Sequence, residues 1–414
     1  MYEYQIIIDV LSAVFNGENL GKSFNDNVAN LDKKINISKI KDISYGVLRN
    51  YYVIESILNK LVTKKPKDEI IKIILLIAIY EIKYTKKPDH AVTNDMVEFS
   101  FSLLQNQQIK GFINAVVRNY IRRKEEIDIS VSNSQVAKYN FPKWWITKLT
   151  KDYPKQYQQI LSNLNIIPKI NLRVNPKKIS LEKYMLLLQN ENIEFTLIEN
   201  KISLTQTIAI NKLPLFNEGA VSVQDIHAQK LIELIEVNKN DYILDACSAP
   251  GGKLCQILEN YDVEVLALDI EQNRLDKVRE NLERLNLKAR LIHGDATTHD
   301  WWNKRLFDVI IADVPCSASG TVKRNPDIKI HRNPSDIGNF VLTQRYIITN
   351  LWQMLKIGGT MVYITCSIFK EENEDNISYF KEIMPGIKII KSFSLLPTEY
   401  ADGFFYCILQ KITI

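Results

Sequence analysis

The pattern of apolar and polar positions changes character along the chain. From residue 1 to about residue 130, apolar residues recur at helical spacing, and no run alternates strictly as a strand does. Connections that contain proline, such as "KKPKD" and "KKPDH", separate these stretches. The pattern predicts an all-helical front part, carried by runs such as "IKDISYGVLRNYYVIESILNKLV" and "DEIIKIILLIAIYEIKY".

The middle of the chain shows two further patterns. Residues 133–164 include "FPKWWITKLTKDYPKQYQQILSNL", which predicts a pair of linker helices. Between residues 165 and 225, short mixed runs such as "KINLRVNP" and "ISLEKYMLLLQNENI" predict a small α+β subdomain. We therefore expect four segments, at residues 1–132, 133–164, 165–225 and 226–414.

The last segment alternates regularly between strand and helix. Short β-rich runs are separated by amphipathic stretches such as "EQNRLDKVRENLERLNL". This alternation predicts a Rossmann-like α/β domain, with an open parallel sheet covered on both faces. The predicted strands are "DYILDA", "VEVLALDI", "ARLIHGDA", "FDVIIADVP" and "GGTMVYITCS".

Composition limits the location and suggests a partner. The longest apolar stretch, residues 70–80, is interrupted by Lys72 and is shorter than the roughly 20 residues of a membrane span. Glu3 and Asp9 stand where a secretory signal carries lysines, so we expect a cytoplasmic protein without membrane contact. Residues 1–160 carry 24 Lys and Arg against 17 Asp and Glu, and the remainder 29 against 31. A basic front part is compatible with an RNA partner.

The cysteines and histidines give no metal-binding pattern. The five cysteines form no C-x-x-C pair, and the five histidines lack zinc-ligand spacing. We expect free thiols and no metal. A cysteine at a strand end is usually a packing residue, an interpretation that suits Cys255 and Cys407.

Four predicted strands end in an acid. Asp245, Asp269, Asp295 and Asp313 each follow an apolar run. A single aspartate at such a place is usually a turn or cap residue. Because ligands of open α/β sheets bind outside the carboxyl ends of the strands, four such acids predict one shared crevice.

The loop "DACSAPGGK" follows the first of these strands. It suits a nucleoside ligand, but it contains no phosphate-binding motif. Its two glycines let the backbone approach a ligand, but the loop matches neither G-x-G-x-x-G nor the Walker pattern. Asp269, 24 residues after Asp245, is placed to accept hydrogen bonds from a ribose diol, and Asp295 to contact an adenine edge. These features favour S-adenosylmethionine as the cofactor.

Several motifs resemble one enzyme family. "DACSAPGGK", "DVPCSASGTVKRNPDIK" and "YITCSIFKEEN" are similar to the signature motifs of RNA cytosine-5 methyltransferases of the RsmB (Fmu, Sun) group. "ISYGVLRNY" and "KGFINAVVRNYIRR" resemble the NusB-like helical RNA-binding domain of that group. Ser248 and Val314 depart from the pattern where alanine is common, and neither removes a functional group.

The resemblance implies roles for two cysteines. Carbon 5 of cytosine becomes nucleophilic only after a thiolate adds to carbon 6. The position of Cys366 is implied to be this nucleophile, and that of Cys316 to assist breakdown of the adduct. Asp313 is implied to bond the cytosine edge. Lys253 is a candidate source of the field that Cys366 needs for a lowered pKa.

The resemblance also implies the ligands. By this resemblance the substrate is expected to be 16S ribosomal RNA, at cytosine-967 and before full subunit assembly, and we expect the enzyme to be a monomer. The alternatives are a 5-methylcytosine methyltransferase of another ribosomal site or of transfer RNA, and a non-catalytic NusB-like factor. The basic run at residues 322–332 is expected to hold RNA phosphates. The residues expected to bind the cofactor are Cys247, Ser248, Ala249, Pro250, Gly251, Gly252, Lys253, Asp269, Arg274, Asp295 and Asp313.

Overall fold

A computed structural model of the chain describes residues 2–29, 31–32, 35–64 and 66–413. The chain divides into two compact units. One, here called the helical unit, comprises Met1–Asn165 and Val322–Arg332; the other, the sheet unit, comprises Ile166–Thr321 and Asn333–Ile414. Within the described residues, no helix is long and apolar enough to cross a membrane.

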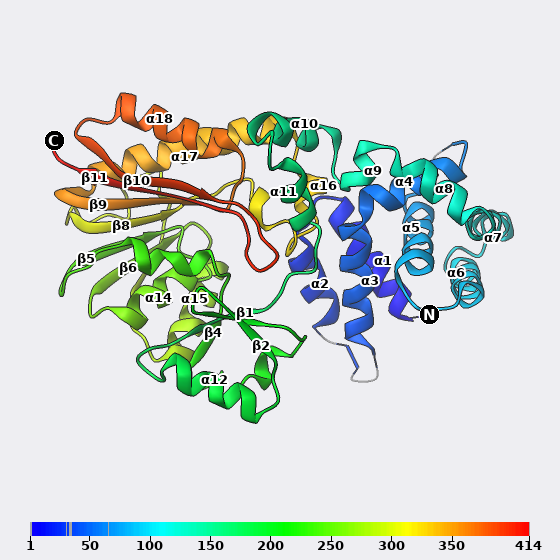
Figure 1. Cartoon of the computed structure of the whole chain (residues 1–414), viewed down its shortest axis with the longest axis horizontal. Coiled ribbons are helices and arrows are strands. Elements are labelled where there is room, and N and C mark those ends of the chain that lie inside the picture. Colours follow the sequence, from blue (N-terminus) through cyan, green and yellow to red (C-terminus); the bar gives the residue numbers. More distant parts are fainter. Residues whose placement is uncertain (1, 30, 33–34, 65, 414) are drawn as a thin grey trace. The chain divides into compact units, whose positions relative to one another are not determined.

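The helical unit consists of α-helices joined by short connections (Figure 1). Several begin at a side-chain cap, as where Asn106 Oδ1 accepts hydrogen bonds from the N–H groups of Gln108 and Ile109. The helices are α1 (Tyr2–Phe15), α2 (Leu20–Val28), α3 (Ile37–Arg49), α4 (Tyr51–Leu61), α5 (Glu69–Tyr84), α6 (Asp89–Leu104), α7 (Gln107–Arg122), α8 (Lys124–Ser132), α9 (Gln135–Tyr139), α10 (Lys143–Asp152), α11 (Tyr157–Asn163) and α16 (Ile328–His331).

Helix α5 is the centre of this unit. Every residue from Ile73 to Ile82 is buried, and these side chains join one core with residues of α1, α3, α4, α6 and α7. A helix that is apolar on all sides must be surrounded by other elements, as the run at residues 70–80 predicts. The one acid in the buried stretch, Glu81, accepts a hydrogen bond from the Tyr4 hydroxyl at 2.7 Å.

The segment Val322–Arg332 is an insertion from the second half of the chain into the helical unit. Lys329 Nζ donates hydrogen bonds to the carbonyl oxygens of Arg49 at 2.7 Å and Asn140 at 2.9 Å. Asp327 accepts one from the backbone N–H of Leu20. Lys323 and Lys329 are at most 1% exposed. The prediction that this basic run holds RNA phosphates is wrong for these two lysines, because their side chains are buried within the protein.

The sheet unit contains a small antiparallel sheet of four strands in the order β2-β3-β1-β4. Helix α12 (Leu181–Asn190) packs on it through Tyr184 and Leu188. The predicted small α+β subdomain is confirmed. Its strands are β1 (Asn171–Val174), β2 (Phe195–Ile198), β3 (Lys201–Leu204) and β4 (Val221–Val223).

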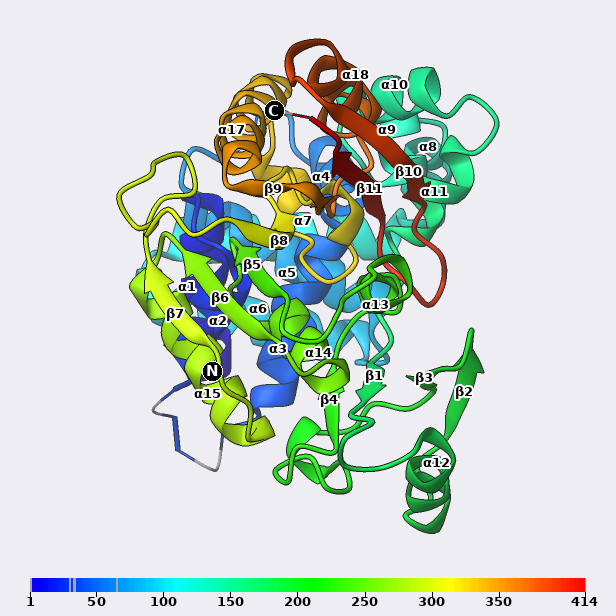
Figure 2. The same cartoon turned by 90° about the vertical axis from the view of Figure 1, so that its left-hand side faces the viewer.

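The larger sheet has seven strands in the order β10-β11-β9-β8-β5-β6-β7 (Figure 2). The five predicted strands are all present and run parallel: β5 (Tyr242–Ala246), β6 (Glu264–Asp269), β7 (Arg290–His293), β8 (Phe307–Asp313) and β9 (Leu355–Thr365). Two further strands, β10 (Ile387–Leu395) and β11 (Phe404–Lys411), extend one edge in antiparallel pairing. The sheet is therefore mixed, and its antiparallel edge was not predicted.

Helices cover both faces of this sheet (Figure 1). Side chains alternate along β5: Tyr242 and Leu244 join the core under α17 and α18, and Ile243 joins the core under α14 and α15. The predicted α/β class with two covered faces is confirmed. The remaining elements are η1 (Ile210–Lys212), η2 (Ala228–Lys230), α13 (Leu231–Leu234), α14 (Gly252–Asn260), α15 (Gln272–Leu285), η3 (Ser319–Thr321), α17 (Pro334–Gln353), η4 (Lys370–Glu372) and α18 (Glu374–Ile383).

The predicted division into four segments stays a prediction. The boundary expected near residue 165 coincides with a unit boundary, but the helical linker belongs to the helical unit, and the small sheet shares a unit with the large one.

Candidate active site

The two cysteines of the sequence motifs meet at the carboxyl edge of the large sheet. Strands β8 and β9 are parallel neighbours, with Asp313 opposite Ile364. The turns that follow them carry Cys316 and Cys366, so both thiols leave the sheet at the same edge. Their Sγ atoms lie 3.4 Å apart. Residues 50 positions apart in the sequence therefore form one dithiol pair.

An ion pair lies beside this dithiol. Lys253 Nζ contacts Asp313 Oδ2 at 2.5 Å, joining the first turn of α14 to the end of β8. Burial lowers the pKa of Lys253, but the charge of Asp313 and its hydrogen bond, and the charge of Cys366, outweigh burial and raise it. Lys253 therefore stays an ammonium group, and its charge interacts with Cys366. Its role as the source of the field that Cys366 needs stays a prediction.

The two thiols have different environments. The hydrogen bond with Cys366 raises the pKa of Cys316, burial raises it further, and so do the negative charges of Cys366 and Glu372. Cys316 is thus held as the S–H partner of the pair. Lys253 is the basic group whose charge interacts with Cys366.

The loop between β5 and α14 is built for close approach of the backbone to a ligand. Cys247 has φ of 59° and Gly251 has φ of 93°, both in the left-handed region, and the Ala249–Pro250 bond is cis. The Ser248 N–H donates to the carbonyl oxygen of Leu268 at 2.9 Å, which fastens the loop to β6. Burial raises the pKa of the Cys247 thiol, so this cysteine stays neutral within the loop.

Asp269 anchors the same loop. Its Oδ2 accepts a hydrogen bond from the Ala249 N–H at 3.0 Å, and its Oδ1 accepts one from the Glu271 N–H at 3.1 Å. Arg274 approaches Oδ1 at 3.7 Å and donates to the Ala249 carbonyl oxygen at 2.9 Å. Asp269 is 2% exposed. A ribose hydroxyl that binds Asp269 would therefore share its carboxylate with the N–H groups of Ala249 and Glu271.

Asp295 forms the turn after β7. Its Oδ1 accepts a hydrogen bond from the Thr297 N–H, and its carbonyl oxygen accepts one from Trp301 Nε1. In the sheet, β8, β5, β6 and β7 lie side by side in that order. The four acids Asp245, Asp269, Asp295 and Asp313 consequently lie along one edge, as the sequence predicts.

Asp245 is 1% exposed, whereas an aspartate that only caps a turn is usually exposed to solvent. The Ser248 hydroxyl donates to its Oδ2 at 2.5 Å, and no described residue donates a hydrogen bond to its buried Oδ1. Burial raises the pKa of this carboxyl to about 7, against the opposing effect of the Ser248 hydrogen bond. A carboxylate oxygen buried beneath a ligand-binding loop without a partner fits a cationic or hydrogen-bond-donating ligand there, such as S-adenosylmethionine.

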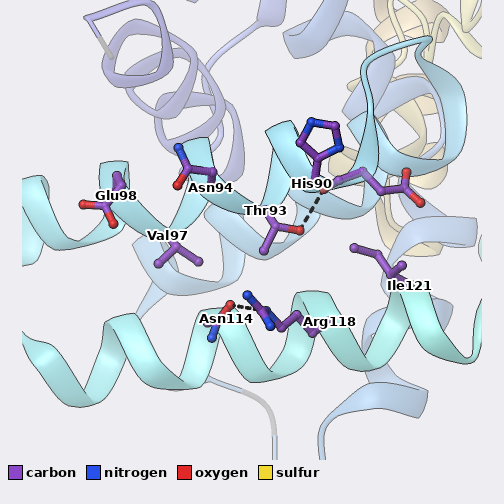
Figure 3. Close-up of a pocket in the computed structure, with 9 residues that line it drawn as sticks. His90, Thr93, Asn94, Val97, Glu98, Asn114, Arg118 and Ile121 are labelled. Carbon is purple, nitrogen blue, oxygen red and sulfur yellow. Dashed lines mark hydrogen bonds between the residues drawn. The ribbon is translucent and has the colours of Figure 1, made fainter.

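A hollow lies in the helical unit, between α6 and α7 (Figure 3). Its volume is about 790 Å³, and it is lined by polar groups from both helices, including His90, Asn94 and Arg118. Arg118 Nε donates to Asn114 Oδ1 at 2.9 Å across one helical turn. The hollow contains no thiol among its lining residues, so it is distinct from the dithiol site.

The described residues contain no group of three or more histidine, cysteine, aspartate or glutamate side chains that could hold a metal ion. The five cysteines are free thiols. Glu372, which contacts the serines beside both cysteines, was not singled out from the sequence, because it stands in the acidic run "KEENED", and such runs are usually solvated.

The combination of a Rossmann-like sheet, a paired thiol site and a helical front unit defines a nucleic-acid methyltransferase class, and sequence comparisons agree. Residues 232–410 match the family model "16S rRNA methyltransferase RsmB/F", residues 4–122 the NusB family, and residues 141–211 the RsmF/B-like ferredoxin-like domain. The chain belongs to the RsmB/F family of 16S rRNA methyltransferases.

Curated relatives match over nearly the whole chain. "Ribosomal RNA small subunit methyltransferase B" of Vibrio cholerae is 36% identical, covering 97% of this chain and 96% of the relative. The protein of the same name from Proteus mirabilis is 37% identical, covering 93% and 92%.

Solved structures share the fold. The crystal structure of PH0851 superimposes with a TM-score of 0.80 at 20% identity, covering 98% of both chains. That of NSun6 from Pyrococcus horikoshii with the ligand SFG gives 0.60 at 21% identity, covering 66% of this chain and 99% of that one.

Proposed function

We propose that this protein methylates carbon 5 of a cytosine in 16S ribosomal RNA, cytosine-967, with S-adenosylmethionine as methyl donor and through a covalent cysteine–cytosine adduct. The observation that carries the proposal is the contact between Cys316 and Cys366, whose sulfur atoms lie 3.4 Å apart at the carboxyl edge of the sheet. One thiol explains how the reaction starts, and the second explains how the product is released. The names of the curated relatives support the ribosomal RNA substrate.

The methyl donor fits the loop after β5. The features that support a donor site here are the left-handed backbone at Cys247 and Gly251, the buried Oδ1 of Asp245 and the strand-end acids. When bound, S-adenosylmethionine supplies an electrophilic methyl group on a positively charged sulfur. In this proposal Asp269 and Asp295 hold the nucleoside part, and residues 247–253 together with Arg274 shape the loop around it.

Cys366 acts first. Its thiolate, beside the Lys253 ammonium, adds to carbon 6 of the flipped cytosine and forms a C6–S bond. The electron pair of the C5–C6 double bond then becomes available at carbon 5 and takes the methyl group. Asp313, whose side chain is 32% exposed, accepts a hydrogen bond from the cytosine amino group. This contact selects cytosine over uracil.

Cys316 acts in the second half. A base removes the carbon 5 proton, the C5–C6 double bond forms again, and the C6–S bond breaks with both electrons on the sulfur of Cys366. The raised pKa of Cys316 keeps its S–H, which donates a hydrogen bond to the departing thiolate. This stabilises the leaving group, so the loss of Cys316 retards release more than attack.

The helical unit is proposed to bind the ribosomal RNA, because residues 4–122 match the NusB family. The target base must be unpaired or flipped, since the thiol and the methyl donor approach different carbons of its ring. Unstacking a base costs a few kcal/mol, so RNA that is not yet fully assembled into a subunit is the more favourable substrate.

The two cysteines are tested by separate substitutions. Cys366→Ala is expected to abolish methyl transfer and adduct formation, because no sulfur can add to carbon 6. Cys316→Ala is expected to accumulate a covalent protein–RNA complex on denaturing gels, because release loses its donor. Both variants should bind S-adenosylmethionine as the native protein does in calorimetry. Cys255→Ala, a buried cysteine outside the site, is the control and should methylate normally.

The reverse pattern, with the adduct accumulating in Cys366→Ala, would exchange the two roles. Bisulfite sequencing of 16S RNA from cells lacking the gene tests the substrate. An unmethylated cytosine-967 is the expected result, and unchanged 16S methylation would contradict the ribosomal target.

A further inference from the structure

The buried carboxylate of Glu372 lies beneath both cysteine turns. Its Oε1 accepts hydrogen bonds from the Ser317 N–H at 2.8 Å and from Gln344 Nε2 at 3.0 Å. Its Oε2 accepts from the hydroxyls of Ser317 at 2.6 Å and Ser367 at 2.5 Å. Ser317 directly follows Cys316, and Ser367 directly follows Cys366. One side chain thus contacts the residue next to each thiol.

Glu372 is held in this place by its own surroundings. It is 0% exposed, and its carbonyl oxygen accepts a hydrogen bond from the Tyr363 hydroxyl at 2.5 Å. Gln344, which is also 0% exposed, bonds the Pro315 carbonyl oxygen as well as Glu372. A buried carboxylate is costly unless its hydrogen bonds are satisfied, and here four donors from three residues supply them.

The two turns are also joined directly. The hydroxyls of Ser317 and Ser367 lie 3.1 Å apart, and those of Ser319 and Ser367 lie 3.0 Å apart. The Ile368 N–H donates to the Ser319 hydroxyl at 2.9 Å, and the Gly320 N–H donates to the Cys366 carbonyl oxygen at 2.8 Å. Glu372 adds to these bonds a carboxylate that both serines share. Removal of Glu372 would take away the charged acceptor that the hydroxyls of Ser317 and Ser367 share, and the Ser317 N–H would lose the same acceptor. A displacement of 1 Å is sufficient to impair a catalytic arrangement.

We propose that Glu372 is a positioning residue of the dithiol site: its carboxylate joins the turns that follow Cys316 and Cys366 and thereby sets the distance between the two sulfur atoms. The step that this distance serves, release of the cytosine adduct, rests on the proposed function; the positioning itself does not. The charge of Glu372 acts in the same direction, since it is one of the causes that raise the pKa of Cys316 and keep that thiol protonated.

The distance between the thiols can be measured without RNA. Phenylarsine oxide condenses with two neighbouring thiols, forming two As–S bonds and one water molecule, and the oxidation state of arsenic does not change. The full-length native protein is expected to bind one equivalent at this site, and Cys316→Ser should remove that binding. Glu372→Ala is expected to reduce the affinity for phenylarsine oxide at least tenfold, and Glu372→Gln to reduce it less, because the amide keeps one acceptor oxygen.

The matched control is Glu382→Gln, which removes the same charge from an exposed position of α18 and should leave capture unchanged. Circular dichroism identifies which variants are folded. If Glu372→Ala does not fold, Glu372→Gln and Ser367→Ala provide the comparison. In methylation assays the Glu372 variants should lower kcat about tenfold or more with KM for RNA unchanged, and a covalent protein–RNA complex should persist longer.

Capture of phenylarsine oxide at native affinity by every folded Glu372 and Ser367 variant would overturn the proposal, and so would the absence of capture by the native protein. The native protein could also fail to methylate RNA while its Glu372 variants lose capture of phenylarsine oxide. That result would support the positioning role and contradict only the proposed function.

Discussion

At the scale of single residues, the strand-end acids differ in ways that the sequence does not reveal. Asp245 and Asp313 both end a strand, yet Asp245 is 1% exposed, whereas the side chain of Asp313 is 32% exposed and pairs with Lys253. Their positions follow from the strand pattern. The protonation of Asp245 depends on burial and on neighbours brought together by the fold, so it could not be predicted from spacing alone.

The carboxyl of Asp245 makes stability depend on pH. Its pKa is about 7 in the folded protein, against roughly 3.9 for an unperturbed aspartate, which represents the unfolded chain. Between these values the folded state binds a proton that the unfolded state has lost. This contribution therefore favours folding at low pH, decreases as pH rises from about 4 to 7, and is absent above that range.

Asp245→Asn should remove this dependence. The amide needs no proton to remain neutral and can still accept the Ser248 hydrogen bond, so the variant is expected to be more stable than the native protein at pH 8 by up to a few kcal/mol. Urea unfolding at pH 5 and pH 8 measures the difference. Asp276→Asn, at an exposed site on α15, is the control. Equal pH dependence in the native protein and Asp245→Asn would refute the assignment.

At the scale of elements, hydrophobic periodicity was sufficient for the helices of the front unit and for the five parallel strands. It was not sufficient for β10, whose residues are half-buried or exposed along its whole length. Nor could it show that β11 pairs antiparallel with β9, since pairing direction depends on the path of the connecting chain. Hydrophobic periodicity also does not show which residues of two helices contact each other.

Two glycines in helices of the same unit illustrate this. A Cβ atom on Gly46 of α3 would lie 2.1 Å from the Tyr80 ring, whereas one on Gly111 of α7 would meet no atom within 4 Å. Gly46→Ala is therefore expected to destabilise the helical unit by about 1–3 kcal/mol through overpacking. Gly111→Ala should stabilise it by up to about 1 kcal/mol through helix propensity. Thermal unfolding compares the two, and a loss of stability in both variants would contradict the packing argument.

At the scale of the whole molecule, the sequence predicts successive segments, but it does not predict that residues 322–332 belong to the helical unit. Residues 322–332 are predicted to form an exposed basic loop that holds RNA phosphates, because lysines and arginines are usually exposed. The structure instead places Lys329 within the helical unit, where burial, and then the charge of Arg49, lower its pKa. Hydrophobic periodicity describes only neighbouring residues in the sequence. It therefore cannot show that this segment packs with residues about 300 positions earlier, as Asp327 does with Leu20.

Lys329 joins three parts of the helical unit. Its Nζ bonds the Arg49 and Asn140 carbonyl oxygens and Asn165 Oδ1, and Asn140 Oδ1 in turn accepts from the Tyr52 N–H at the start of α4. Lys329→Ala leaves buried carbonyl groups without their donor, a change that costs about 1–3 kcal/mol for each group.

The expected result of Lys329→Ala is faster amide hydrogen exchange in α4 and α9, measured by mass spectrometry on the full-length protein. Lys381→Ala, at an exposed position of α18, is the control and should leave these helices unchanged. Native exchange rates in α4 and α9 of Lys329→Ala would show that the buried Lys329 side chain does not hold this region.

The insertion of Val322–Arg332 also has a consequence for biosynthesis. A ribosome delivers the chain from its amino end, and domains generally fold as they emerge. The helical unit stands first in the sequence, but its last segment emerges only after strands β1 to β8 of the other unit. The unit that begins to fold first is therefore completed late, and a nascent chain that stops before residue 322 lacks the segment that supplies Asp327 and Lys329 to it.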